Sequence, residues 1–123
     1  MRPFHLALPT QKLEATQQFY CDVLGCSLGR TSDHWIDINL FGHQLVFHDC
    51  GIEAPAQAHN PVDAHSVPVP HFGVVLTPED HRALCEKIDG QVEFIIEPSV
   101  RFEGMPGEQR IVFFSDPNGY ALE

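Results

Sequence analysis

Two histidines and one glutamate, far apart in the chain, form a residue set suited to a divalent metal ion. His5 and His71 are 66 positions apart (71 minus 5), and Glu123 follows 52 positions later (123 minus 71). Two imidazole nitrogens and one carboxylate oxygen are typical iron(II) or manganese(II) ligands, and they leave positions open for substrate and oxygen. The separations fit no local zinc-binding motif, so only the fold can bring the three together. A lone strand histidine is more often a core or surface residue, so the hypothesis depends on the elements that position all three.

The first part of the chain predicts a strand, a helix and three further strands. An apolar run forms the first strand, and Pro9-Thr10 ends it and offers a helix N-cap. Apolar residues then recur at helical spacing up to Leu24, and Gly25 supplies the left-handed residue that commonly ends a helix. The expected elements are a strand at 4–8, a helix at 11–24, and strands at 26–30, 34–40 and 43–48.

The second part of the chain predicts the same order of elements. Thr77-Pro78 places a cap and a proline at the first helical position, which is a strong signal for a helix start. Ahead of it, the proline-rich residues 49–70 show no hydrophobic period and predict a long connecting loop. The expected elements are a strand at 71–76, a helix from 78 to about 88, and strands at about 92–97, 109–114 and 120–123.

This repetition predicts an α+β fold of two βαβββ modules, which form a curved, partly open mixed β-barrel with the helices outside. We expect a single domain over residues 1–123, with one half at about 1–50, a connecting loop at about 51–69 and a second half at about 70–123. Each of the two candidate histidines then lies near the start of the first strand of its half. Function is expected on the concave face, which neither helix covers.

The composition excludes several classes of partner. The chain has 17 acidic and 7 basic residues and a formal net charge of -10. Such a charge repels phosphate backbones and anionic lipids, so neither nucleic acid nor a membrane is an expected partner. No apolar run is long enough to span a bilayer and the N-terminus has no signal-peptide pattern, so we expect a cytoplasmic protein. The four cysteines fit no zinc-ribbon or CxxC spacing and are expected to be free thiols.

Four segments of the chain carry a more specific pattern: residues 5–9 (HLALP), 13–26 (LEATQQFYCDVLGC), 71–75 (HFGVV) and 116–123 (DPNGYALE). Together they resemble the vicinal oxygen chelate superfamily, which includes glyoxalase I, bleomycin-resistance and fosfomycin-resistance proteins and extradiol dioxygenases. Arg30, residues 35–37 (WID) and residues 41–44 (FGHQ) are most similar to a group of short proteins in the extradiol dioxygenase-like branch.

The resemblance implies paired βαβββ modules and one divalent metal ion per site. It places the metal between a histidine that opens each half and a glutamate in the last strand, and His5, His71 and Glu123 match these positions one by one.

The presence or absence of a fourth ligand separates the chemistries within this superfamily. A glyoxalase-type isomerase has a carboxylate or glutamine in the first half, placed four residues after a turn glycine as Glu123 is in the second half. The same count from Gly42 gives Val46, which cannot bind a metal, and this favours an open three-ligand site. A two-residue shift in register would instead offer Gln44 or His48 as a ligand, since alternate residues share a strand face.

Gln44 and His48 are also the candidate catalytic residues. The resemblance implies that extradiol enzymes use a pocket histidine in this strand and a tyrosine ahead of the Asp-Pro turn. Here Gln44 stands near the place of that histidine, and Phe113 takes the place of the tyrosine. His48 can substitute as acid/base because imidazole titrates near neutral pH, although a surface role at the strand end is an equal alternative.

The leading functional hypothesis is a divalent-metal-dependent, dioxygenase-like enzyme that acts on a small substrate with vicinal oxygens. Iron(II) or manganese(II) is the expected metal, with zinc and nickel as alternatives. The other hypotheses are a glyoxalase-type lyase or fosfomycin-resistance-type thiol transferase, and a metal-free small-molecule binding protein like the bleomycin-resistance members.

A homodimer is expected, with each site completed by one chain or by two. Because Glu123 is the final residue, we expect either a sequence truncated after it or a protein without a tail there.

Overall fold

The computed structural model describes residues 2–62 and 65–123, and the chain divides into two compact units. The first unit contains the residues up to Pro55 together with Pro117–Gly119, and the second contains Ala56–Asp116 and Tyr120–Glu123. None of the helices in the described part of the chain is long and apolar enough to cross a membrane.

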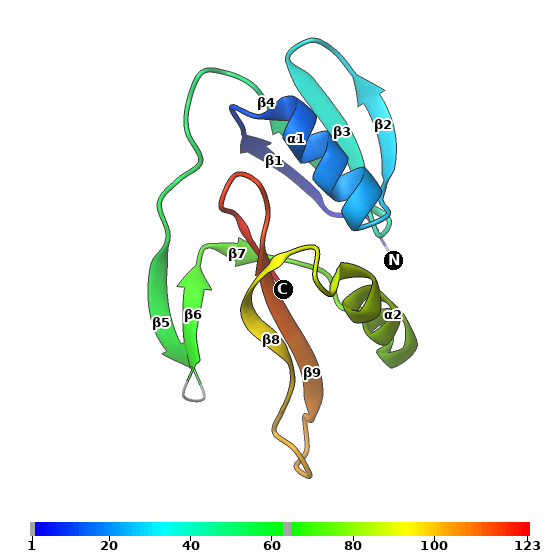
Figure 1. Ribbon diagram of the computed structural model, residues 1–123, viewed down its shortest axis with the longest axis vertical. Coiled ribbons are helices and arrows are strands. Elements are labelled where there is room, and N and C mark those ends of the chain that lie inside the picture. Colours follow the sequence, from blue (N-terminus) through cyan, green and yellow to red (C-terminus); the bar gives the residue numbers. More distant parts are fainter. Residues whose placement is uncertain (1, 63–64) are drawn as a thin grey trace. The chain divides into compact units, whose positions relative to one another are not determined.

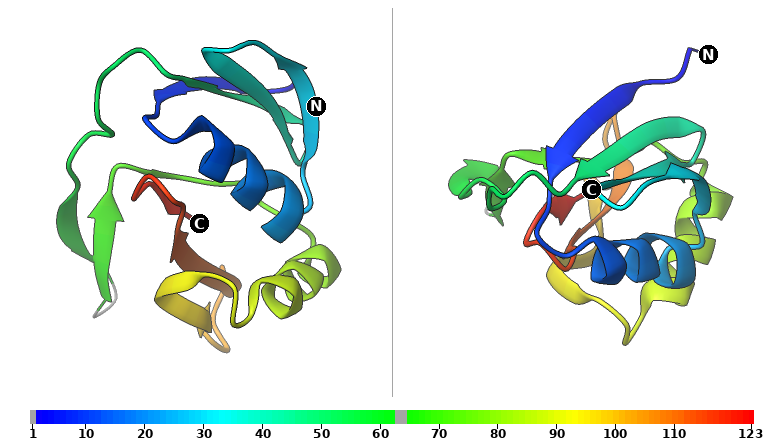
Figure 2. Two further views of the ribbon diagram at one scale, coloured as in Figure 1. Left: turned by 45° about the horizontal axis from the view of Figure 1, so that its top comes forward. Right: turned by 90° about the horizontal axis from the view of Figure 1, so that it is seen from above.

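The first unit is a four-stranded sheet with one helix on one of its faces (Figures 1 and 2). The helix α1 (Leu13–Gln18) continues into a π-helical turn at Phe19–Val23 and ends at Gly25, whose φ of 80° supplies the left-handed conformation expected there. The strands are β1 (His5–Pro9), β2 (Ser27–Thr31), β3 (Trp35–Leu40) and β4 (His43–His48).

The second unit repeats this arrangement and adds a pair of strands. Its helix α2 (Pro78–Ile88) begins where expected, with the Thr77 side chain accepting a hydrogen bond from the Asp80 N–H and a proline in the first turn. The strands of the sheet are β7 (His71–Phe72), β8 (Glu93–Arg101), β9 (Gln109–Ser115) and β10 (Ala121–Leu122), and the added strands are β5 (Ala58–Val62) and β6 (His65–Val69).

The strand order confirms the predicted duplication. The first sheet has the order β1-β4-β3-β2 and the second has the order β7-β10-β9-β8, so corresponding strands occupy corresponding places. In both sheets the first strand of the module pairs parallel with its neighbour, as β1 with β4 and β7 with β10. The other pairs are antiparallel. The α+β class and the two βαβββ modules are therefore as the sequence predicts.

Each unit has its own apolar core, built by residues that alternate along the strands. In the first unit Ile38, Leu45 and Phe47 are fully buried, and Tyr20 from the π-helical turn packs on Phe47 with ring centroids 5.1 Å apart. In the second unit the core cluster consists of Val67, Ile96, Ile111 and Phe113.

Two expected elements differ most from the structure, while β8 extends to Arg101 instead of ending at about residue 97. Within residues 49–70, expected as a loop, β5 and β6 pair antiparallel because Val67 belongs to the core cluster of the second unit and Val62 packs against that cluster. Residues 63 and 64 of that expected loop lie outside the described residues. The strand expected at 71–76 is observed only at His71–Phe72, because its partner β10 ends at Leu122 and the ladder stops at the bond from the Val74 N–H to the Glu123 carbonyl.

Thr10 is not at the N-cap position of α1, although its hydroxyl accepts a hydrogen bond from the Lys12 N–H, just ahead of the helix, at 2.9 Å. The N-cap of α1 is Lys12, with no side-chain cap bond, and Thr10 is completely buried. Its hydroxyl donates to the Asn118 side-chain oxygen at 2.6 Å, and the Asn118 amide donates to the Thr16 hydroxyl at 3.0 Å. This network ties the start of the chain to the Pro117–Gly119 turn, which comes shortly before β10 and Glu123 in the sequence.

Candidate metal centre

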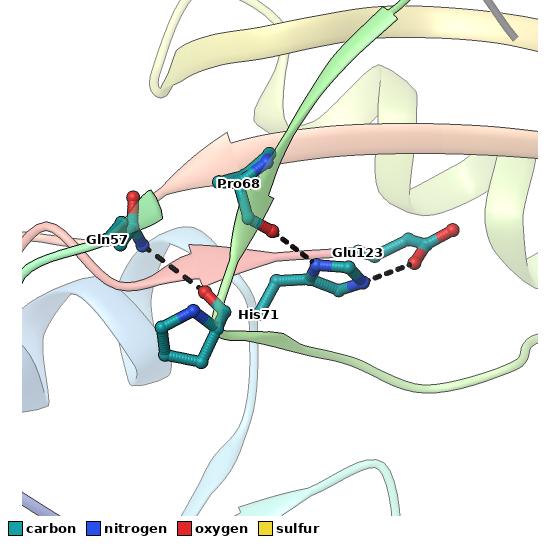
Figure 3. Close-up of polar contacts among 5 residues, drawn as sticks. Gln57, Pro68, His71 and Glu123 are labelled. Atoms are coloured by element: carbon teal, nitrogen blue, oxygen red, sulfur yellow. Dashed lines mark hydrogen bonds and ion pairs between the residues drawn. The ribbon is translucent and has the colours of Figure 1, made fainter. Parts of the chain in front are cut away.

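The fold brings His71 and Glu123 together in the second unit. β7 and β10 are neighbouring parallel strands with Ala121 opposite His71, so the residue two positions later, Glu123, points to the same side as that histidine. The His71 Nε2 lies 3.2 Å from the Glu123 Oε2, and Figure 3 shows the two side chains facing one another. The side chains are 29% and 35% exposed, so a ligand can reach both.

Gly73 allows the backbone of Glu123 to come this close. The Glu123 N–H donates to the Phe72 carbonyl at 2.9 Å, and the Val74 N–H donates to the Glu123 carbonyl at 3.2 Å. A Cβ atom at position 73 would clash with the Glu123 carbonyl oxygen and lie 2.6 Å from its carbon. The missing side chain of Gly73 is therefore a condition for the position of the carboxylate.

The imidazole of His71 is held in one orientation by two contacts. Its Nδ1 lies 2.7 Å from the Pro68 carbonyl oxygen, which can only accept, so Nδ1 carries a hydrogen (Figure 3). The edge of the ring packs on Phe113, with centroids 5.0 Å apart and planes at 77°. Nearby, the Gln57 amide donates to the Pro70 carbonyl at 3.5 Å, on the segment that joins β6 to β7.

In this orientation a positive charge between the His71 Nε2 and the Glu123 Oε2 would be stabilising. With the hydrogen of a neutral imidazole on Nδ1, the His71 Nε2 presents a lone pair to the Glu123 carboxylate. Two acceptors 3.2 Å apart are stabilised only by a proton or a metal cation between them. A histidine that donates through one ring nitrogen and leaves the other unprotonated is the arrangement usual for metal ligands. The two side chains therefore fit a divalent metal ion.

His5 lies in the first unit and also has one ring nitrogen engaged. Its Nδ1 is 2.8 Å from the Gln44 Oε1, and the Gln44 Nε2 donates to the Asp37 Oδ2 at 3.2 Å. Asp37, which the sequence reasoning did not select, is thus linked through Gln44 to a predicted ligand. The sequence did contain a signal for it, since Asp37 is a carboxylate in the middle of an apolar strand. Because side chains alternate along a strand, it lies on the same sheet face as Gln44.

The register of β4 supports the assignment of Val46 as the counterpart of Glu123. Gln44, Val46 and His48 pair with His5, Ala7 and Pro9 of the parallel strand β1, as Glu123 would pair with Gly73 in the second sheet. Val46 therefore occupies the place where the second half carries its carboxylate, and its side chain cannot bind a metal.

His48, predicted as acid/base, is exposed at the end of β4. It lies on the same strand face as Gln44, about 13 Å along the strand from it at the usual rise per residue. In the described residues no hydrogen bond involves its imidazole. Catalytic roles for Gln44 and His48 stay predictions.

The predicted ligand set is divided between the two units. His5 belongs to the first, while His71 and Glu123 belong to the second. Within either unit, no group of three or more His, Cys, Asp or Glu side chains is placed to hold a metal among the described residues. The pair His71 and Glu123 is thus observed, and the convergence of His5 with it stays a prediction.

A cavity of about 590 Å³ adjoins the pair in the second unit. It lies beyond the end of β10. There no strand of the described residues fills the space between residues 73–76 and residues 109–112, and both segments line the cavity. Two residues that the sequence reasoning did not select, Arg110 and His81, also line it. Burial, with a smaller contribution from the Arg110 charge, lowers the pKa of His81 below its ordinary value, which favours the neutral imidazole at pH 7.

Comparison with solved structures finds the same fold in several proteins. A glyoxalase/bleomycin resistance protein/dioxygenase from Alicyclobacillus acidocaldarius is 30% identical, with a TM-score of 0.79 over 98% of this chain and 87% of that one. The fosfomycin resistance protein FosX from Listeria monocytogenes is 14% identical, with a TM-score of 0.69 over 99% and 89% of the chains. Lactoylglutathione lyase from Agrobacterium tumefaciens is 18% identical, with a TM-score of 0.62 over 98% and 90%.

Comparison with family models is more decisive than the structural likeness. Among curated protein sequences none matches the chain. The model described as Glyoxalase/Bleomycin resistance protein/Dioxygenase superfamily matches residues 2–123, which is nearly the whole sequence. Together with the 30% identical structure and the repeated βαβββ topology, this match shows that the chain belongs to the glyoxalase/bleomycin resistance protein/dioxygenase superfamily.

Proposed function

We propose that the protein is a divalent-metal-dependent, dioxygenase-like enzyme that acts on a small substrate with two neighbouring oxygens. His5, His71 and Glu123 would hold the ion, with iron(II) or manganese(II) preferred over zinc or nickel for this donor set. The observation that carries the proposal is the contact between the His71 Nε2 and the Glu123 Oε2, with the opposite ring nitrogen of His71 engaged by a carbonyl.

The residues around the site have separate tasks in this proposal. When bound, the ion would act as a Lewis acid toward the vicinal oxygens of the substrate. The Pro68 carbonyl and the Phe113 ring keep His71 from rotating, and the ladder at Gly73 keeps Glu123 in place. His48 stays the candidate acid/base, and because it lies about 13 Å along β4 from Gln44 it would serve only a substrate group remote from the His5 ligand.

The identity of residue 46 favours an oxygenase over a glyoxalase-type lyase. A fourth protein ligand in the first half would fill a position that substrate and oxygen need, and Val46 leaves that position open. The alternatives are a lyase, a thiol transferase and a metal-free binding protein, which differ from an oxygenase in oxygen consumption or in metal dependence.

The first experiment measures metal content by elemental analysis of freshly purified protein. We expect about one divalent ion per chain in the wild type, and less in His5→Ala, His71→Ala and Glu123→Gln, because each substitution removes one ligand. His34→Ala and Glu97→Gln are matched controls, since both residues are exposed and lie in the turn between β2 and β3 and on β8, and these variants should keep the metal. Equal metal content in all six proteins would contradict the proposal.

The second experiment identifies the chemistry. Oxygen consumption after reconstitution with ferrous iron, in the presence of catechol-type substrates, is expected of an oxygenase. Turnover of a thiol or hemithioacetal substrate without oxygen consumption would favour the lyase or transferase. Binding of a small molecule with the same affinity in the wild type and in His71→Ala would favour the metal-free binding protein.

A homodimer is part of the proposal. It is supported by the edge strand β2, all of whose residues are exposed, and by exposed apolar side chains after β8, where Phe102 is 42% and Met105 is 62% exposed. Light scattering coupled to size-exclusion chromatography should give twice the mass of 13.8 kDa. A mass of one chain at micromolar concentration would contradict this part.

A further inference from the structure

Three polar side chains lie in a row across one face of the first sheet, on three neighbouring strands. Asp37 comes from β3, Gln44 from β4 and His5 from β1. The Asp37 Oδ2 is 3.2 Å from the Gln44 Nε2, and the Gln44 Oε1 is 2.8 Å from the His5 Nδ1. The row ends at the imidazole of a predicted metal ligand.

The chemistry of the row allows only one assignment of hydrogens. An ionised Asp37 carboxylate can only accept, so it requires the NH₂ group of Gln44 and turns the amide oxygen toward His5. That oxygen also can only accept, so the His5 Nδ1 must donate. In a neutral imidazole the Nε2 is then unprotonated, and its lone pair is available to a cation.

The position of the Asp37 carboxylate is itself restricted by the neighbouring strand. On β2, a Cβ atom at Gly29 would come within 3.3 Å of both the Asp37 Cγ and its Oδ2. The carboxylate therefore packs directly on the backbone of Gly29, and it is half-buried while Gln44 and His5 are exposed. A partly buried carboxylate is a firmer anchor than an exposed amide or imidazole.

We propose that Asp37 and Gln44 are positioning residues that hold His5 in its Nδ1–H form, with Nε2 directed to a divalent ion. This inference rests on the proposed function. In the first half the Gln44 side chain would accept the hydrogen of the His5 Nδ1, as the Pro68 carbonyl accepts that of the His71 Nδ1 in the second half. It also assigns Gln44 to the support of a ligand, in place of metal binding or acid/base catalysis.

The first test needs no metal. Long-range ¹H–¹⁵N NMR spectra of the apoprotein at pH 8 report which nitrogen of His5 carries the hydrogen, with His5→Gln used for assignment. The wild type should show hydrogen on Nδ1, and Gln44→Leu should shift the population to Nε2–H. Hydrogen on Nε2 in the wild type, or the same tautomer in both proteins, would overturn the inference.

The second test exchanges the amide and the carboxylate. Asp37→Asn alone leaves two amides that can pair in either orientation, so part of the Nδ1–H population should be lost, whereas Gln44→Glu alone puts a carboxylate beside His5 that still accepts from Nδ1. In the double variant the amide introduced at position 37 can donate to a carboxylate at position 44, which again accepts from His5. The double variant should therefore recover the Nδ1–H form that Asp37→Asn loses, and a double variant no better than Asp37→Asn would count against the inference.

The third test measures affinity for Co²⁺ alone by calorimetry and by its visible spectrum. Gln44→Leu should weaken binding roughly ten- to a hundredfold, as the loss of such support does in other metal sites. Gln17→Leu, an exposed position on α1, is the matched control and should bind as the wild type does. Circular dichroism establishes that each variant is folded.

An error in the proposed metal centre and an error in the positioning role would give different results. If the wild type and Glu123→Gln bind Co²⁺ equally, or neither binds it, the proposed metal centre is wrong and this inference falls with it. If Glu123→Gln loses the ion while Gln44→Leu binds it like the wild type, the metal centre stands and the positioning role is overturned.

Discussion

The replacement Gly73→Ala tests whether the position of Glu123 depends on close backbone contact. The added Cβ would clash with the Glu123 carbonyl oxygen and lie 2.6 Å from its carbon, whereas ordinary contacts begin at 3.4 Å. The two backbones must therefore separate by at least about 0.8 Å, the difference between these distances. Gly73 has no left-handed backbone conformation, so alanine adds this contact without adding backbone strain.

The separation affects both stability and metal binding. It stretches the two hydrogen bonds that flank Glu123, from its N–H to Phe72 and from Val74 to its carbonyl. Each is worth about 0.5–1.5 kcal/mol net, so the free energy of unfolding should fall by about 1–3 kcal/mol. Metal–ligand distances tolerate changes of only about 0.2 Å, so a carboxylate moved by several times that distance should weaken metal affinity at least roughly tenfold.

Urea denaturation of the apoprotein and calorimetric titration with Co²⁺ measure the two effects. Val75→Ala is the control, because Val75 is fully exposed on the same segment, and it should change stability by less than about 0.5 kcal/mol and leave metal affinity unchanged. If Gly73→Ala has the stability and affinity of the wild type, the contact does not position Glu123 and the reasoning is refuted.

Three further predictions concern the rest of the chain. Asn118→Ala removes the acceptor of the completely buried Thr10 hydroxyl and should lower the free energy of unfolding by about 1–3 kcal/mol in urea denaturation. Burial lowers the pKa of His81, so the unfolded chain takes up a proton first as pH falls, and stability should decline below about pH 6.5. Denaturation at pH 7.5 and 5.5 should show a smaller decline in His81→Asn. Because burial raises the pKa of the Cys85 thiol, the exposed Cys50 should be alkylated first at pH 8, as measured by mass spectrometry.

Each of these has a result that would contradict it. An Asn118→Ala variant as stable as the wild type would mean that the buried hydroxyl finds another partner. If the free energy of unfolding depends on pH in the same way in the wild type and in His81→Asn, protonation of His81 does not destabilise the protein. Alkylation of Cys85 ahead of Cys50 would mean that burial does not protect its thiol.

The sequence determined the class of fold and the residues that were candidates for metal binding. Hydrophobic periods, Gly25 and the Thr77-Pro78 helix start are local signals, because they act through neighbouring residues of one segment. They were sufficient to predict two βαβββ modules, and the alternation along β4 was sufficient to place Gln44, Val46 and His48 on one strand face.

Only the tertiary structure decided how far each element extends and what each polar group contacts. The strand at His71 is short because its partner ends at Leu122, and Thr10 binds Asn118 from the far end of the chain. The contact between His71 and Glu123 depends on parallel pairing across 52 residues, and the hydrogen on the His5 Nδ1 depends on Asp37 two strands away. Hydrogen bonds and strand pairs of this kind join segments that are remote in the chain, and no local pattern encodes their partners.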